Sequence, residues 1–121
     1  MDMNVNISHK SARYCWTTVC LLDELAENSG QCALVNEKQI AIFRLADVEE
    51  IFAMDNFDPF SQANVLSRGV VGDLQGELVV ASPVYKQHFK LADGQCLEDT
   101  SVRVASYATR VLHGAVQVAV E

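Results

Sequence analysis

The stretch QCALVNEKQIAIFRL, residues 31–45, decides the fold class. It contains two apolar runs separated by Asn-Glu-Lys, a connection whose length suits a hairpin between two strands. Because a strand places alternate side chains on opposite faces, Ile40 and Ile42 share one face of the second run. Ala41 and Phe43 share the other face. Both faces are apolar, which predicts a central strand that is covered on both sides.

The flanking sequence continues in the same manner, with short β-rich runs separated by turn residues. We expect about nine strands, at residues 16–22, 31–35, 39–45, 50–54, 77–81, 87–91, 95–97, 102–112 and 115–120. One short helical turn is expected at residues 23–27, and the strand at 102–112 is expected to be interrupted near Ala108. This pattern predicts an all-β, antiparallel sandwich or barrel. A flexible tail is expected at residues 1–12, followed by a single domain at residues 13–121.

Residues 55–72, DNFDPFSQANVLSRGVVG, interrupt this regular pattern. The segment is rich in Asp, Asn, Gly and Pro, and we expect a long loop with one turn of helix at residues 62–66. Loops of this length within a compact domain usually carry a function.

Charge and composition exclude several classes of function. The 121 residues carry a net charge of −7, and the nine Lys and Arg residues form no cluster. Binding to nucleic acid or to an anionic membrane surface requires clustered positive charge. The sequence has no apolar run long enough to span a membrane and no signal-like apolar stretch near its start. We therefore expect a cytoplasmic protein that binds neither nucleic acid nor membrane.

No constellation of catalytic or metal-binding residues is visible in the sequence. The cysteines, at positions 15, 20, 32 and 96, include no C-x-x-C pair, and we expect Cys20 and Cys32 to be small buried hydrophobes. The histidines, at positions 9, 88 and 113, are expected to be solvated surface residues. We predict no catalytic residue and no metal site in this chain.

Two segments resemble the cluster-binding loops of Rieske domains. Residues 53–69, AMDNFDPFSQANVLSRG, resemble the loop that carries C-x-H, and residues 82–96, SPVYKQHFKLADGQC, resemble the loop that carries C-P-x-H. The resemblance places Asp58, Phe60, Ser82 and Tyr85 at the four ligand positions. A Rieske cluster needs two thiolates and two imidazoles, which these side chains do not provide. We therefore expect a vestigial, empty cluster-binding subdomain of two loops.

The pattern without ligands is similar to one family, the small subunit of assimilatory NADH-dependent nitrite reductase. The segments that carry this resemblance are CALVNEKQIAIFRL (32–45), NFDPFSQANVLSRG (56–69) and GELVVASPVYKQHFKLADGQCLED (76–99). The resemblance implies a Rieske-like β domain within an enzyme that reduces nitrite to ammonium. It also implies a large catalytic subunit as partner, which carries FAD, a [4Fe–4S] cluster and siroheme, and no cofactor in this chain.

The two loops are our candidate docking surface for that partner. Phe57, Pro59, Phe60 and Tyr85 would form an aromatic patch, a composition that favours protein interfaces. Alternatively, Phe60 and Tyr85 fold inward and fill the space that a cluster would occupy. Two other functions remain open from the sequence alone, a Rieske-type [2Fe–2S] electron-transfer ferredoxin and a stand-alone binding module.

Overall fold

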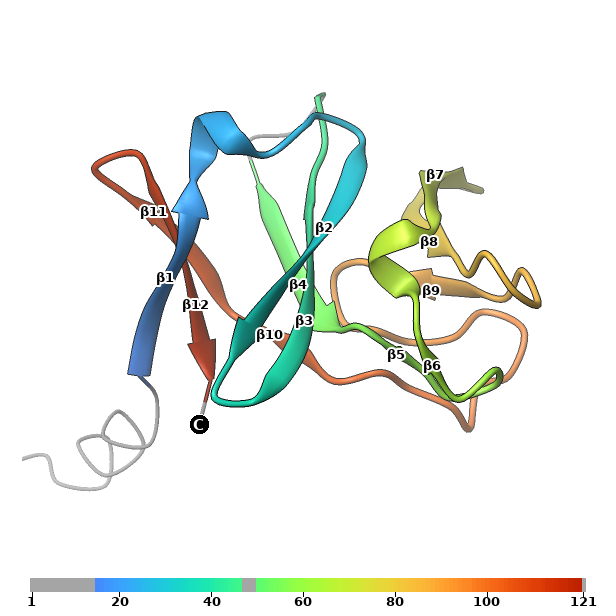
Figure 1. Ribbon diagram of the computed structural model, residues 1–121. Coiled ribbons are helices and arrows are strands. Elements are labelled where there is room, and N and C mark those ends of the chain that lie inside the picture. Colours follow the sequence, from blue (N-terminus) through green and yellow to red (C-terminus); the bar gives the residue numbers. More distant parts are fainter. Residues whose placement is uncertain (1–14, 47–49, 121) are drawn as a thin grey trace, which may run out of the picture.

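The computed structural model describes residues 15–46 and 50–120, which form twelve strands in four antiparallel sheets (Figure 1). The strands are β1 (Cys15–Leu21), β2 (Ser29–Val35), β3 (Lys38–Arg44), β4 (Ile51–Asp55), β5 (Phe57–Asp58), β6 (Ala63–Asn64), β7 (Val70–Leu74), β8 (Glu77–Ala81), β9 (His88–Lys90), β10 (Ser106–Tyr107), β11 (Thr109–Leu112) and β12 (Ala115–Val120). In this part of the chain the helical segments are two 3₁₀ turns, η1 (Leu22–Glu24) and η2 (Leu66–Arg68). The all-β prediction is confirmed. The tail predicted at residues 1–12 lies outside the described residues.

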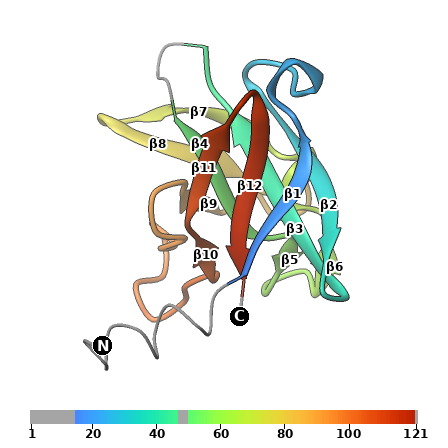
Figure 2. The same ribbon diagram turned by 90° about the vertical axis from the view of Figure 1, so that its left-hand side faces the viewer.

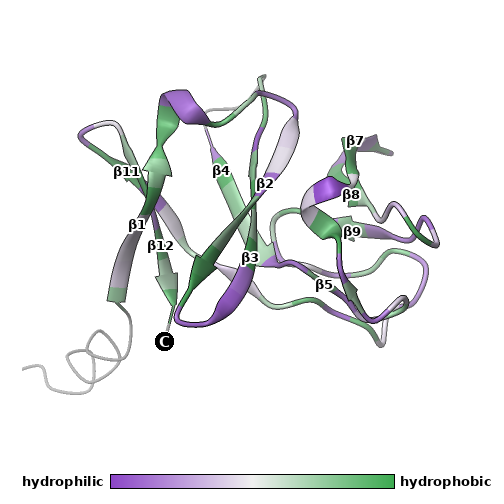
Figure 3. Cartoon of the chain, in the orientation of Figure 1, coloured by the Kyte–Doolittle hydropathy of each residue, from purple (hydrophilic) through white to green (hydrophobic). Residues whose placement is uncertain are grey.

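Two sheets face each other and form a sandwich. One has the order β1-β12-β11 and is seen in front in Figure 2, and the other has the order β10-β4-β3-β2. Strand β12 alternates as predicted, because Val116, Val118 and Val120 are all buried in the core between the sheets. They pack there against Ile40 and Ile42 of β3. Figure 3 shows β12 largely hydrophobic, whereas the turn between β2 and β3 is hydrophilic.

Strand β3 is central, as predicted, because β2 and β4 pair with it on either side. Its second face is also covered. Ala41 and Phe43 belong to another core, which they share with Leu66, Phe89 and further residues from the later part of the chain. The β2–β3 hairpin turns at two residues with positive φ angles, 50° and 67°. This conformation at both central residues matches the twist of the flanking strands.

The chain leaves the sandwich after β4 and returns at β10, and the intervening residues 56–105 form a separate region that we call the tip. Strands β4 and β10 pair with each other, so that the two ends of the tip lie side by side. The Asp55 N–H donates to the Ala105 carbonyl (2.9 Å), and the Tyr107 hydroxyl donates to Asp55 Oδ1 (2.5 Å). Partial burial, together with this contact to a carboxylate, raises the pKa of Tyr107 well above its ordinary value. The hydroxyl therefore remains a hydrogen-bond donor, and it joins β10 to β4 at the point where the chain enters and leaves the tip.

Several predictions for residues 55–112 are wrong. Residues 55–72 are not a loop, because they contain β5, β6 and the first part of β7, and the helical turn lies at η2 rather than at 62–66. Strand β7 is mostly exposed, so no alternation of buried and polar residues marks it in the sequence. Residues 95–97 make only isolated bridges, Phe89 with Cys96 and Gln95 with Arg103. The expected strand at 102–112 is reduced to β10 and β11, with the predicted break at Ala108.

Candidate functional site

The two loops that the sequence singled out meet at Asp58 and Ser82. Asp58 ends the short strand β5, and Ser82 directly follows β8. The Ser82 hydroxyl donates to Asp58 Oδ2 at 2.5 Å, although the two residues are far apart in the sequence. Both side chains are fully buried. The positions that the resemblance aligns with the two Rieske cysteines are therefore in direct contact.

Each partner also organises the loop that follows it. Asp58 Oδ1 accepts hydrogen bonds from the backbone N–H groups of Phe60 (2.8 Å) and Ser61 (3.4 Å). The Ser82 hydroxyl oxygen accepts from the N–H group of Val84 (3.3 Å). Side chains of Asp and Ser commonly form turns by such local contacts with the backbone. One continuous set of hydrogen bonds therefore links both loops.

The two aromatic residues at the former imidazole positions have different environments. Phe60 is half-buried and packs towards the core, with its ring centroid 6.1 Å from that of Phe89. Tyr85 is 61% exposed. Phe57 is also exposed, at 43%, and Pro59 is half-buried. The structure thus places one of the two aromatic residues inward and one outward.

Sequence reasoning missed two features of this site. Val84 is exposed and directly precedes Tyr85, but the resemblance assigned no role to its position. The contact between Asp58 and Ser82 was also not anticipated. A signal for it was present, because an acceptor and a donor stand at two positions that the resemblance brings together.

Other residues that the sequence singled out lie elsewhere. The prediction that Cys32 is buried is wrong, since it is exposed on the edge strand β2, where its thiol lies 3.6 Å from Gln39 Oε1. Cys20 is half-buried against the sandwich core. His88 is not simply solvated, because its Nδ1 lies 2.6 Å from Glu98 Oε2. His113 is exposed in the β11–β12 turn, and His9 lies outside the described residues.

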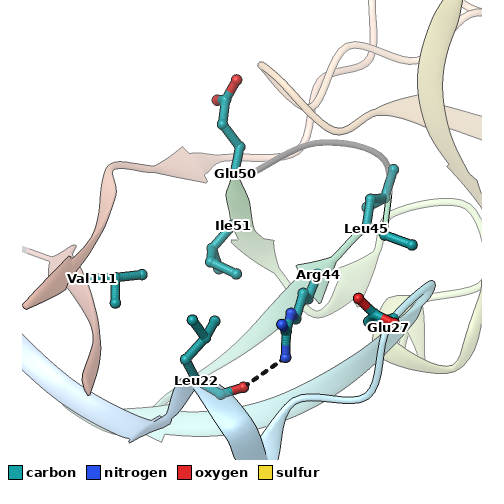
Figure 4. A pocket seen from close by; sticks show the side chains of 8 residues that line it. Leu22, Glu27, Arg44, Leu45, Glu50, Ile51 and Val111 are labelled. Carbon is teal, nitrogen blue, oxygen red and sulfur yellow. Dashed lines mark hydrogen bonds between the residues drawn. The ribbon is translucent and has the colours of Figure 1, made fainter. Parts of the chain in front are cut away.

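A pocket of 430 Å³ opens at the start of β4, at the opposite end of that strand from Phe57 (Figure 4). Its lining residues are Leu22, Glu27, Arg44, Leu45, Ala46, Glu50, Ile51 and Val111. Arg44 Nη1 donates to the carbonyls of Leu22 (3.1 Å) and Leu25 (3.2 Å), and Figure 4 shows Glu50 directed away from it. The guanidinium therefore connects β3 to the η1 segment.

Fold and sequence together define the class of the protein. A family model described as a Rieske-like [2Fe-2S] domain matches residues 15–119. The nitrite reductase (NADH) small subunit of Escherichia coli (strain K12) is 46% identical over 102 residues, which cover 84% of this chain and 94% of that protein. The NMR structure of the E. coli protein NirD superimposes with a TM-score of 0.82 at 44% identity, covering 88% of this chain and 97% of that one. The chain belongs to the family of nitrite reductase (NADH) small subunits.

A third relative is much longer than this chain. It is the nitrite reductase [NAD(P)H] large subunit of Klebsiella oxytoca, which is 42% identical over 103 residues. The match covers 85% of this chain but only 11% of that protein. A domain of the present kind is therefore part of that longer polypeptide.

The residues at the ligand positions do not fit the [2Fe–2S] cluster for which the family model is named. Rieske iron is held by thiolate and imidazole ligands. Phe60 has no donor atom, and Asp58, Ser82 and Tyr85 offer only hard oxygen donors. Within the described ranges, no group of three His, Cys, Asp or Glu side chains is arranged to hold a metal ion. No helix among the same residues is long and apolar enough to cross a membrane.

Proposed function

We propose that this chain is a non-catalytic subunit of NADH-dependent nitrite reductase, which binds the large catalytic subunit and supports it without carrying electrons. The observation that carries the proposal is the hydrogen bond between Asp58 and Ser82. These residues occupy the two cysteine positions of the Rieske pattern and engage each other. Transfer of single electrons through this domain would need a bound cofactor, and its ligands are replaced.

The proposed partner is the large subunit. The Klebsiella oxytoca protein supports this, because a domain like the present one is joined covalently to a chain that is named a large subunit. A domain that is fused in one organism and separate in another is expected to contact the same partner in both. In the proposed complex, nitrite is reduced to ammonium on the large subunit. The FAD, [4Fe–4S] cluster and siroheme that the resemblance implies would be located there.

The proposed docking surface is the outer face of the two tip loops. Phe57 and Tyr85 are exposed there together with Val84, and such aromatic residues are enriched among the residues that dominate interface energies. Pro59, in the first of these loops, is half-buried. Phe60 takes a different role in this proposal, because its contact with Phe89 anchors the first loop to the core.

Binding of the large subunit by variants of this chain tests the docking surface. The double variant Phe57→Ala/Tyr85→Ala should bind at least about 30-fold more weakly, since two interface anchors at roughly 1 kcal/mol or more each are lost. The matched control is Leu112→Ala, which removes a similarly exposed side chain from β11. Unchanged affinity of the double variant, measured by titration calorimetry, would refute the assigned surface.

The supporting role is tested by nitrite-dependent NADH oxidation of the large subunit with and without this chain. Added chain should raise the turnover or the thermal stability of the large subunit.

Purified chain should contain neither iron nor acid-labile sulfide and should be colourless. Stoichiometric iron and sulfide would overturn the proposal and favour an electron-transfer ferredoxin.

A further inference from the structure

Asp58 has a fully buried carboxyl group, which cannot itself contact a docking partner. Its side chain is fully buried, and no Lys, Arg or His of the described chain forms a salt bridge with it. A buried carboxylate without an opposite charge is costly unless hydrogen-bond donors satisfy it. Here the donors are the Ser82 hydroxyl and two backbone N–H groups of the first loop. Within the described part of the chain, the groups that satisfy this buried side chain therefore all belong to the two loops.

The same contact involves residues that lie close in the sequence to both exposed aromatic residues. Phe57 is the residue directly before Asp58, and on the other side Ser82 accepts the N–H of Val84, the residue directly before Tyr85. A second bond within that loop, from the Ser82 N–H to the Gln87 carbonyl (2.9 Å), closes it behind Tyr85. Movement of one loop relative to the other would therefore break the bond between Asp58 and Ser82.

We propose that Asp58 is a positioning residue for docking: through its hydrogen bond to Ser82 it couples the two loops, so that Phe57 and Tyr85 are presented to the large subunit as one preformed surface. This inference rests on the proposed function. In a Rieske domain, iron joins the two cysteine positions. In this chain a carboxylate–hydroxyl contact joins them, and the tip is held in shape without a metal. A surface that is ordered before binding loses less conformational entropy on association.

The variant Ser82→Ala tests the proposal, because it removes the link between the loops and leaves both backbone contacts of Asp58 in place. The matched control is Ser61→Ala. Ser61 lies in the first loop, and its buried hydroxyl has no hydrogen-bond partner among the described residues, so the control removes the same atom without removing a known bond. We expect Ser82→Ala to bind the large subunit about tenfold more weakly at a temperature well below its unfolding midpoint, and Ser61→Ala to bind within about twofold of the parent.

Hydrogen exchange of the free chain provides a second readout that does not depend on the partner. Ser82→Ala should accelerate exchange of the Val84 amide in its own loop and also of the Phe60 amide in the other loop, each by about tenfold or more. Acceleration confined to the loop at residues 82–87 would refute the coupling. Coupled acceleration with unchanged affinity would show a purely structural contact and would also overturn the proposal.

The two proposals fail in different ways. A parent chain that does not bind the large subunit would refute the proposed function, while the exchange measurement would still decide whether the loops are coupled. If Ser82→Ala does not fold, Ser82→Cys replaces it. A thiol is a much weaker hydrogen-bond donor and acceptor than a hydroxyl, so this variant should weaken binding in the same direction.

Discussion

The sandwich and the tip are stabilised by different kinds of contact. Between the two sheets of the sandwich the buried side chains are aliphatic, from Ile40 and Ile42 on one side to Val116, Val118 and Val120 on the other. The tip also has an apolar core, which Phe89 shares with Phe43 of β3. However, the four buried polar residues of the described chain all lie in the tip. They are Asn56, Asp58, Ser67 and Ser82.

This difference shows what each region requires of its sequence. Apolar packing tolerates exchange among side chains of similar volume, so the sandwich needs only the correct alternation. Buried polar groups are costly unless each finds its partner, so the tip needs particular residues at particular positions. The two partners of a buried polar contact in the tip, such as Asp58 and Ser82, can therefore be exchanged only together.

The largest expected effect comes from the core that joins the two regions. Phe43→Ala removes a fully buried ring from β3 and should lower the free energy of unfolding by about 3–5 kcal/mol. Urea unfolding, followed by the fluorescence of Trp16, measures the loss. The control Leu34→Ala, on the neighbouring strand and 73% exposed, should change the free energy of unfolding by less than about 0.5 kcal/mol. A loss below about 1 kcal/mol for Phe43→Ala would contradict a shared core.

A turn within the tip should give the next largest effect. A Cβ atom at Gly94, where φ is 78°, would lie 1.9 Å from the Val104 carbonyl oxygen. Gly94→Ala should therefore cost about 2–4 kcal/mol, from both backbone strain and overpacking. Gly76→Ala is the control, because Gly76 has a φ of 87° but nothing within 4 Å of its added Cβ. It should cost only about 1–2 kcal/mol. Equal losses in thermal unfolding would show that the close approach is unimportant.

The sandwich could be predicted from the sequence because its signal is periodic. The alternation of β12 follows from valines spaced by two, and the central position of β3 from a run that is apolar on both faces. The hairpin of residues 31–45 follows from the short connection between two apolar runs. Cys32 was the exception. The run CALV is apolar throughout, and nothing in it shows which side chain of this edge strand is exposed.

The tip could be predicted only in part, because its structure depends on single contacts between distant residues. The resemblance placed Asp58 and Ser82 at equivalent positions in two loops, but only the structure brings their side chains together. Strand β7 went unnoticed because it is an exposed edge strand without alternation. The inward position of Phe60 depends on its packing against Phe89, a residue distant in the sequence, which no local pattern specifies.

Asn56 tests the polar contacts that attach the tip to the sandwich. Its Oδ1 accepts the Ser67 N–H (2.7 Å) and its Nδ2 donates to Gln39 Oε1 (3.1 Å). Asn56→Ala leaves the buried Ser67 amide without a partner, and the free energy of unfolding should fall by about 1–3 kcal/mol. Asn64→Ala, an exposed change in the same region, should cost no more than about 0.5 kcal/mol. Equal stabilities of the two variants in urea would refute this role of Asn56.

The smallest expected effect concerns the contact between His88 and Glu98, and it depends on pH. Although partial burial acts in the opposite direction, hydrogen bonds from the backbone N–H and the ring of His88 lower the pKa of Glu98 below its ordinary value. A carboxyl group whose pKa is lower in the folded state stabilises the fold above its ordinary pKa, about 4.3. This contribution is lost as the pH falls through the pKa of the folded state.

Glu98→Gln removes the contribution of this one carboxyl group to the pH dependence of stability. The parent should be more stable than the variant at about pH 6, and the difference should shrink towards about pH 3. The Glu98 side chain is 45% exposed, so solvent screening limits the difference to less than about 1 kcal/mol. Glu37→Gln, which removes a carboxylate from the β2–β3 turn of the sandwich, is the control, and subtracting its pH dependence isolates the His88 contact. A difference between parent and Glu98→Gln that grows as the pH falls would contradict the sign and show that protonated Glu98 is the form that the tip stabilises.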